Sequence, residues 1–158
     1  GETEQVLTHI DIDDILTEKH FEMKKAQLLE NTKKRGKNVS TIDWANITYA
    51  EYVEKYEKTK TSCLKQTIAG RKFHELNRKL REELSSVDGA VIVDFDGTII
   101  ACGAIVRIEA GSMGGGRLAA TSTLAKYGVA VKISRDGIMQ AFMADKKTGR
   151  VKPIFTVG

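Results

Sequence analysis

Residues 88–106 read DGAVIVDFDGTIIACGAIV, and this stretch decides the local fold. Ala90–Asp94 is a short apolar run of the kind that forms a buried strand. Asp96-Gly97 is a strong signal for a tight hairpin turn, because glycine supplies the positive φ that such turns need. Thr98–Val106 is then the returning strand, so the sequence predicts an antiparallel hairpin.

The chain that follows the hairpin predicts a loop, one helix and three more strands. Three consecutive glycines close the loop, and Gly128 follows the helix in the usual C-terminal position. Asp136-Gly137 predicts the turn of a second hairpin, and Pro153 restricts the last strand to a sheet edge. The expected elements are a loop over 107–116, a helix over 117–127 and strands over 129–133, 138–143 and 151–156.

The chain that precedes the hairpin predicts helices. Only three of the 14 glycines lie before residue 88, and lysine and glutamate are frequent there. Apolar spacing predicts one helix over 11–34. Thr48 and Glu51 form a capping-box pattern at the start of a second long helix, with a break expected at 59–67 or at Gly70.

Together these elements predict an α/β (α+β) protein with a mixed central β-sheet and helices packed around it. We expect an N-terminal helical region over 1–85, with two or three helices, and a β-sheet core over 86–158. The length suits one compact unit with a substantial core.

Composition excludes several classes of protein. Of the 158 residues, 41% are hydrophobic and 29% are charged, which is a soluble globular balance. No apolar run approaches the ~20 residues that span a bilayer, and no signal-peptide pattern opens the chain. We therefore expect a cytoplasmic protein without a membrane partner. Cys63 and Cys102 have no metal-ligand spacing and fit free thiols, with a single disulfide left open.

The net charge of +4 raises the question of nucleic acid. Basic residues alternate with acidic ones along the predicted helices, which is typical of a solvated face. No DNA- or RNA-reading motif accompanies them, so the sequence disfavours a nucleic-acid partner. His9, His20 and His74 have no carboxylate or cysteine at ligand spacing, and we expect them to be surface or packing residues.

The segment Val93–Ile99 resembles the first motif of the haloacid-dehalogenase phosphatases, with Asp94 as nucleophile and Asp96 as general acid. That family also needs a later lysine and an acidic pair for Mg²⁺. Fewer than 65 residues follow Asp94, and the next apolar run follows Asp96-Gly97 directly. A tight turn between antiparallel strands is therefore favoured, and the phosphatase is a distant alternative.

A second resemblance covers about 55 residues. Asp88-Gly89-Ala90 before a hairpin, followed by a glycine-rich loop that opens a helix, resembles the nucleotide-binding domain of the diadenylate cyclases (the DisA N-terminal-like family). The resemblance implies that Asp88 binds Mg²⁺ or Mn²⁺ and that Asp88 and Arg117 are catalytic. It also implies an ATP-like ligand held by residues of both loops: Asp88, Gly89, Ala90, Ser112, Gly114, Gly115, Gly116 and Arg117.

The second loop departs from the family, which carries an Arg-His-Arg triplet where this chain has Gly116, Arg117 and Leu118. Phosphoryl transfer needs matched positive charge, and losing one such donor typically costs ~10²–10³ in rate. The sequence therefore predicts a domain that senses a nucleotide or a nucleotide-derived second messenger without full cyclase activity. We expect a homo-oligomer or a fused effector domain. The alternative is an active cyclase that makes cyclic di-AMP from two ATP molecules across a dimer.

Overall fold

The computed structural model describes residues 1–35, 42–56, 65–108, 115–134 and 136–158. It combines helices with small antiparallel sheets, so the expected α+β class and the N-terminal helices are confirmed. Two compact units make up the chain. The first comprises Gly1–His9 with Val106–Gly158, and the second comprises Ile10–Ile105. This division differs from the boundary expected after residue 85, because the first hairpin packs with the helices that precede it.

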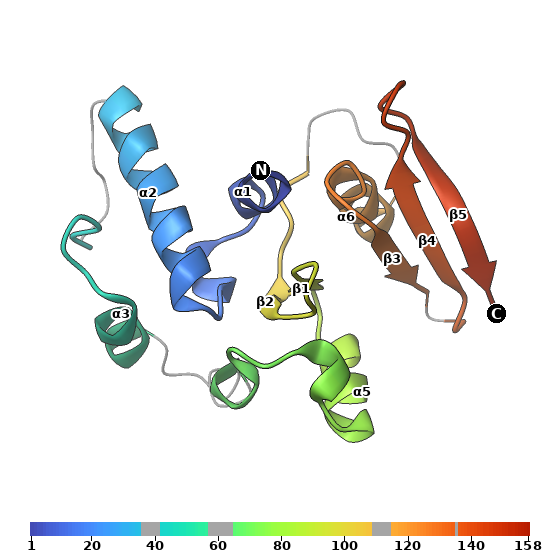
Figure 1. The fold of residues 1–158 in the computed structure, drawn as a ribbon, viewed down its shortest axis with the longest axis horizontal. Helices are drawn as coiled ribbons and strands as arrows, with labels where there is room; N and C mark the ends of the chain where they lie inside the picture. Colours follow the sequence, from blue (N-terminus) through green and yellow to red (C-terminus); the bar gives the residue numbers. More distant parts are fainter. Residues whose placement is uncertain (36–41, 57–64, 109–114, 135) are drawn as a thin grey trace. The chain divides into compact units, whose positions relative to one another are not determined.

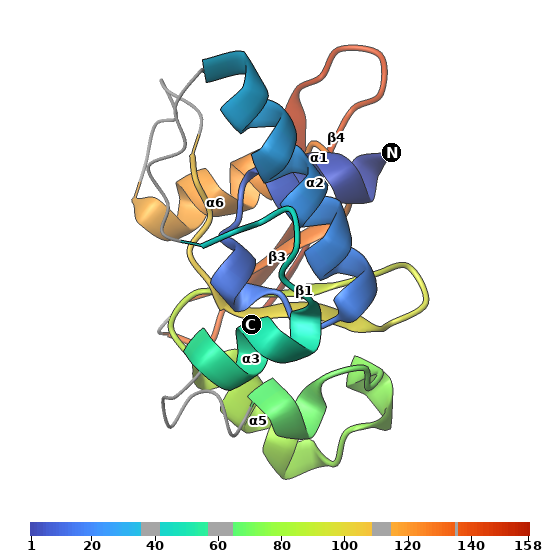
Figure 2. The ribbon, with the colours of Figure 1, turned by 90° about the vertical axis from the view of Figure 1, so that its left-hand side faces the viewer.

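The second unit is mainly helical (Figure 1). Among its described elements are the α-helices α2 (Glu18–Arg35), α3 (Tyr49–Tyr56) and α5 (Arg78–Ser86), with 3₁₀ turns η1 (Ile12–Asp14) and η2 (Phe73–Glu75). The Phe21 ring of α2 lies 5.2 Å from the rings of Tyr49 and Tyr52, which places α3 beside α2 (Figure 2).

Helix starts follow local capping chemistry. The predicted capping box of α3 is confirmed: Glu51 N donates to Thr48 Oγ1 at 3.2 Å, and Thr48 N donates to Glu51 Oε2 at 3.0 Å. The helix expected over 11–34 was wrong at its start. Thr17 caps α2, because its Oγ1 accepts a hydrogen bond from His20 N at 3.2 Å, and the chain before it forms η1.

The predicted first hairpin is confirmed. Strands β1 (Ala90–Val93) and β2 (Ile99–Ala104) are antiparallel, with Val93 opposite Ile99. At the tip, Gly97 N donates to Asp94 O at 2.9 Å, and Gly97 has a φ of +88°. Glycine is therefore favoured at that position of the turn.

Strand β2 is held by neighbours from two other segments of its unit. Leu16 N donates to Ile100 O at 2.8 Å, and Ile99 N donates to Arg71 O at 3.1 Å. The hydrophobic core gathers around the same strand and consists of Leu16, Ile68, Leu76, Leu84, Ile99 and Cys102. Cys102 is a buried free thiol, and burial raises its pKa; Cys63 lies outside the described residues.

The first unit contains α1 (Glu2–Thr8), α6 (Gly116–Leu124) and a three-stranded sheet (Figure 1). The strands β3 (Ala130–Ile133), β4 (Met139–Ala144) and β5 (Val151–Val157) are arranged in the order β3-β4-β5. Pro153 therefore lies on an edge strand, as the sequence predicts, and a register shift follows the Ala141–Phe155 pair. Helix α6 lies next to β3.

One sequence expectation needs correction: the described strands form two antiparallel sheets and no mixed central sheet. The physical reason is local. The β1–β2 and β3–β4 hairpins close at the pairs Asp96-Gly97 and Asp136-Gly137, and residues 145–150 join β4 to β5. Each strand therefore pairs with an antiparallel neighbour in sequence, whereas parallel pairing needs a crossover of a dozen or more residues. Within the described ranges, no helix is long and apolar enough to cross a membrane.

Candidate functional site

The Asp88-Gly89-Ala90 loop joins α5 to β1. Helix α5 ends at Ser86, and the exposed Asp88 follows two residues later, after Val87. Gly89 has a φ of +104°, and a Cβ placed on it would lie 2.5 Å from Gly103 C and 2.9 Å from Ala104 N. Only glycine lets this loop lie directly against the backbone of β2. The close approach fixes Asp88 at the entrance to β1.

The glycine-rich loop opens α6. Gly115 is the N-cap residue, no side chain makes a cap hydrogen bond there, and no acidic residue occupies the first turn. A Cβ on Gly115 or Gly116 would meet nothing within 4 Å, and Arg117 is exposed. The first backbone N–H groups of a helix have no partner within the helix and carry partial positive charge. This loop therefore combines backbone donors with a guanidinium group.

The predicted site residues come from different units. Asp88, Gly89 and Ala90 belong to Ile10–Ile105, whereas Gly115, Gly116 and Arg117 belong to the unit that contains Val106–Gly158. Ser112 and Gly114 lie outside the described residues. The structure thus gives the local geometry of each loop, and their joint action on one ligand stays a prediction.

A metal ion at Asp88 would take most of its ligands from a bound nucleotide and water. Across the ranges that the structure describes, no three His, Cys, Asp or Glu side chains gather in a way that could hold a metal ion. Mg²⁺ in nucleotide sites is commonly bound by one or two carboxylates together with substrate phosphates. The exposed Asp88 carboxylate fits that partial role, in which the nucleotide supplies the remaining ligands.

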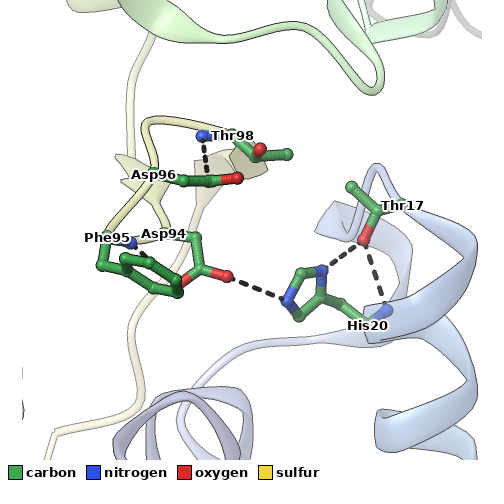
Figure 3. Close-up of polar contacts among 6 residues, drawn as sticks. All are labelled: Thr17, His20, Asp94, Phe95, Asp96 and Thr98. Atoms are coloured by element: carbon green, nitrogen blue, oxygen red, sulfur yellow. Dashed lines mark hydrogen bonds and ion pairs between the residues drawn. The ribbon is translucent and has the colours of Figure 1, made fainter.

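The carboxylates of Asp94 and Asp96 help to form the turn between β1 and β2 (Figure 3). Asp94 Oδ1 accepts a hydrogen bond from Phe95 N at 2.8 Å, and Asp96 Oδ1 accepts one from Thr98 N at 2.9 Å. The hydrogen bonds from Thr98 lower the pKa of Asp96. Both carboxylates therefore act as turn-stabilising acceptors, as the tight-turn interpretation expects.

Figure 3 also shows a polar group that the sequence analysis missed. His20 at the start of α2 is buried, its Nδ1 is hydrogen-bonded to Thr17 Oγ1, and its Nε2 lies 3.8 Å from Asp94 Oδ2. Asp94 is 74 positions away in sequence, so spacing could not reveal this contact. The one available signal was Thr17 three residues before His20, which is a helix-capping spacing.

The other two histidines differ from His20. His74 is exposed, as a surface residue would be. His9 follows α1, where its Nδ1 lies 2.9 Å from Arg107 O and its Nε2 lies 3.3 Å from the Tyr127 hydroxyl. His9 therefore packs within its own unit, in agreement with the expected packing role.

Comparisons of the chain with protein-family models, with curated proteins and with solved structures find no match. A function for this chain is therefore inferred from the residues of the two loops and from their local geometry.

Proposed function

We propose that this protein is a nucleotide-binding module, similar to the diadenylate cyclase domain, that senses a nucleotide or a nucleotide-derived second messenger. The observation that carries the proposal is the opening of α6, where Gly115 and Gly116 leave the backbone uncovered directly before the exposed Arg117. Arg117 adds a planar donor that can bind two phosphate oxygens at once. A phosphate group is the natural ligand for this combination.

The Asp88-Gly89-Ala90 loop, the other motif of the resemblance, supports the same function. Its carboxylate is exposed, and Gly89 ties the loop to β2 by a close backbone approach. A rigid loop loses little conformational freedom when it binds a ligand or a metal ion held by ligand phosphates. We propose that Asp88 binds Mg²⁺ or Mn²⁺ only together with the nucleotide.

We favour a sensor over a cyclase because the loop before α6 has too few positively charged side chains for synthesis. Transfer between two ATP molecules needs several preorganised positive groups around the reacting phosphoryl. The loop offers Arg117 with Gly116 before it and Leu118 after it, in place of the family's Arg-His-Arg triplet. Backbone N–H donors remain sufficient for binding a phosphate, since binding requires no stabilisation of a transition state.

Replacing Arg117 with alanine tests the proposal. Calorimetry with ATP, GTP and cyclic di-AMP should detect binding to the wild type at concentrations up to millimolar. Loss of a charge-assisted hydrogen bond of about 1.5–3 kcal/mol should weaken this binding by about 10- to 100-fold. Arg117 is exposed and alanine is a good helix former, so α6 should persist.

Arg150→Ala is the matched control, because Arg150 is also exposed and lies in the same unit, before β5. Its affinity should equal that of the wild type. An absence of binding by any of the three nucleotides, or equal affinities for Arg117→Ala and Arg150→Ala, contradicts the proposed function.

Asp88→Asn tests the metal role separately. The change keeps the size of the side chain and removes the negative charge that binds a divalent cation. We expect the wild type to bind nucleotide more tightly with Mg²⁺ or Mn²⁺ than with EDTA, and the variant to lose this difference. A variant that keeps the full metal dependence would show that Asp88 is not a ligand.

The active cyclase remains the second candidate, and the Asp88-Gly89-Ala90 match is the observation in its favour. Incubation with ATP and Mn²⁺ at high protein concentration, followed by mass spectrometry, distinguishes the two functions. Cyclic di-AMP that disappears in Asp88→Asn supports the cyclase. Bound nucleotide without cyclic product supports the sensor.

A further inference from the structure

His20 connects the start of α2 to the turn between β1 and β2. His20 is 3% exposed, and its Nε2 atom has no hydrogen-bond partner among the described residues. The Asp94 Oδ2 atom that it faces is 3.8 Å away, beyond hydrogen-bond length. Both elements belong to the same compact unit. The imidazole and the carboxylate are therefore close but make no hydrogen bond with each other (Figure 3).

The neighbouring hydroxyl indicates where the imidazole proton lies. Thr17 Oγ1 accepts a hydrogen bond from the backbone N–H of His20 and also shares a hydrogen bond with His20 Nδ1. When the hydroxyl donates to Nδ1, the single proton of neutral imidazole lies on Nε2, facing the Asp94 carboxylate. A second proton would go to Nδ1, where it competes with the hydroxyl hydrogen of Thr17. Protonation therefore reverses this hydrogen bond, so that Thr17 Oγ1 accepts from Nδ1–H, and it places a charge on a buried ring.

The charges around the imidazole do not compensate for its burial. Burial lowers the pKa of His20 from its ordinary value of 6.5; Asp94 opposes this, Lys19 adds to it, and Asp96 opposes it weakly. Lys24, one helical turn further along α2, is also buried. Desolvation of a charge can exceed the attraction of a partner that makes no hydrogen bond. The closed contact thus favours neutral imidazole.

We propose that the His20–Asp94 contact is a proton-sensitive link: the β1–β2 turn packs against α2 while His20 is neutral, and the contact opens when His20 binds a proton. This inference does not depend on the proposed nucleotide function. Strand β1 runs from the residue after Gly89 to the residue before Asp94. Opening of the link therefore acts on the strand that follows the Asp88 loop.

The pH range follows from the direction of the pKa change. Above about pH 6.5 the His20 ring is neutral in both the closed and the open form, so the closed form keeps its full stability. As the pH falls from 6.5 towards the lower pKa of the closed form, the open form binds the proton first. The equilibrium then shifts towards opening by up to about tenfold per pH unit, the limit for one proton.

Hydrogen exchange read by mass spectrometry tests the link. Exchange at pH 7.5 and pH 5.5, corrected for intrinsic rates, should show loss of protection in acid for the turn amides. These include Gly97 N, which donates to Asp94 O, and Ile99 N, which donates to Arg71 O. His20→Gln should remove this pH dependence, because glutamine does not titrate.

His74→Gln is the matched control. His74 is exposed, and its Nδ1 lies 2.7 Å from the position that a Cβ on Gly97 would occupy, so it lies beside the same turn. This variant should keep the wild-type acid response. Equal protection of the wild type at both pH values, or an unchanged acid response in His20→Gln, overturns the proposal.

Asp94→Asn provides a second test if His20→Gln does not fold. The Asp94 charge raises the proton affinity of His20, so its removal should move the titration of the His20 ring signals, followed by NMR, to lower pH than in the wild type. At a given acidic pH the opening seen by hydrogen exchange should be larger than in the wild type, because the closed form of the variant binds the proton less tightly. A His20 titration that is unchanged in Asp94→Asn contradicts the link.

Discussion

Replacing Gly89 with alanine should lower the free energy of unfolding by about 3 kcal/mol, since two costs add. The first is backbone strain, because a φ of +104° is rarely adopted by residues with a Cβ. The second is overlap, because the new Cβ would lie 2.5 Å from Gly103 C and 2.6 Å from Gly103 O. These are backbone atoms of β2, so no side-chain rotation can relieve the overlap. Chemical denaturation measures the change.

Gly149→Ala separates the two costs. Gly149 also has a positive φ, +69°, but a Cβ placed on it would meet nothing within 4 Å. We expect it to cost only the strain of the left-handed conformation, about 1–2 kcal/mol. Equal losses of stability for the two variants would falsify the close approach between the Asp88 loop and β2.

Local sequence signals predicted the hairpins well for a physical reason. At Asp96-Gly97 the turn conformation depends on the residues within it, so the prediction needs no knowledge of distant contacts. The same holds for the capping box of Thr48 and Glu51, whose two hydrogen bonds span three residues. Pro153 is similar, because a missing N–H excludes a central strand whatever the neighbours are.

Signals that depend on distant partners were missed. His20 has a polar side chain in a mixed-charge helix, and its contact with Asp94 depends on a residue 74 positions away in the sequence. The start of α2 was placed too early because Ile15 and Leu16 fit a helical apolar pattern. In the structure Ile15 instead forms a bridge with Ala101, and Leu16 N donates to Ile100 O, so pairing with β2 determines their backbone.

In the candidate site, too, local motifs identify single residues but do not predict how distant residues relate. Gly89 and Gly115–Arg117 could be identified from local motifs, since a loop next to a strand or a helix start needs those residue types. The relation between Asp88 and Arg117 could not be predicted in this way, because the two residues belong to different compact units. Nucleotide affinities of the single and double variants measure that relation directly. Energies that do not add indicate that both residues act on one ligand.

The second large effect concerns Leu84, which lies in α5 and is fully buried in the core around β2. Leu84→Ala removes three buried carbon atoms and leaves a cavity, and such changes cost 2–5 kcal/mol, with about 3 kcal/mol expected here. Leu84 also connects the core to the candidate site, because Val87 N donates to Leu84 O at 3.3 Å and Asp88 is the next residue. Denaturant unfolding and hydrogen exchange of β2 should both report the loss.

Leu80→Ala is the control for Leu84→Ala. Leu80 lies one turn earlier on α5 and packs against the same core, but it is only partly buried. The two variants change helix propensity equally, so any difference between them measures burial. We expect Leu80→Ala to cost about 1 kcal/mol, because less apolar surface leaves water on folding at this position. A loss at Leu80 equal to or greater than that at Leu84 would show that α5 presents a different face to β2, and that the Asp88 loop is not anchored through this core.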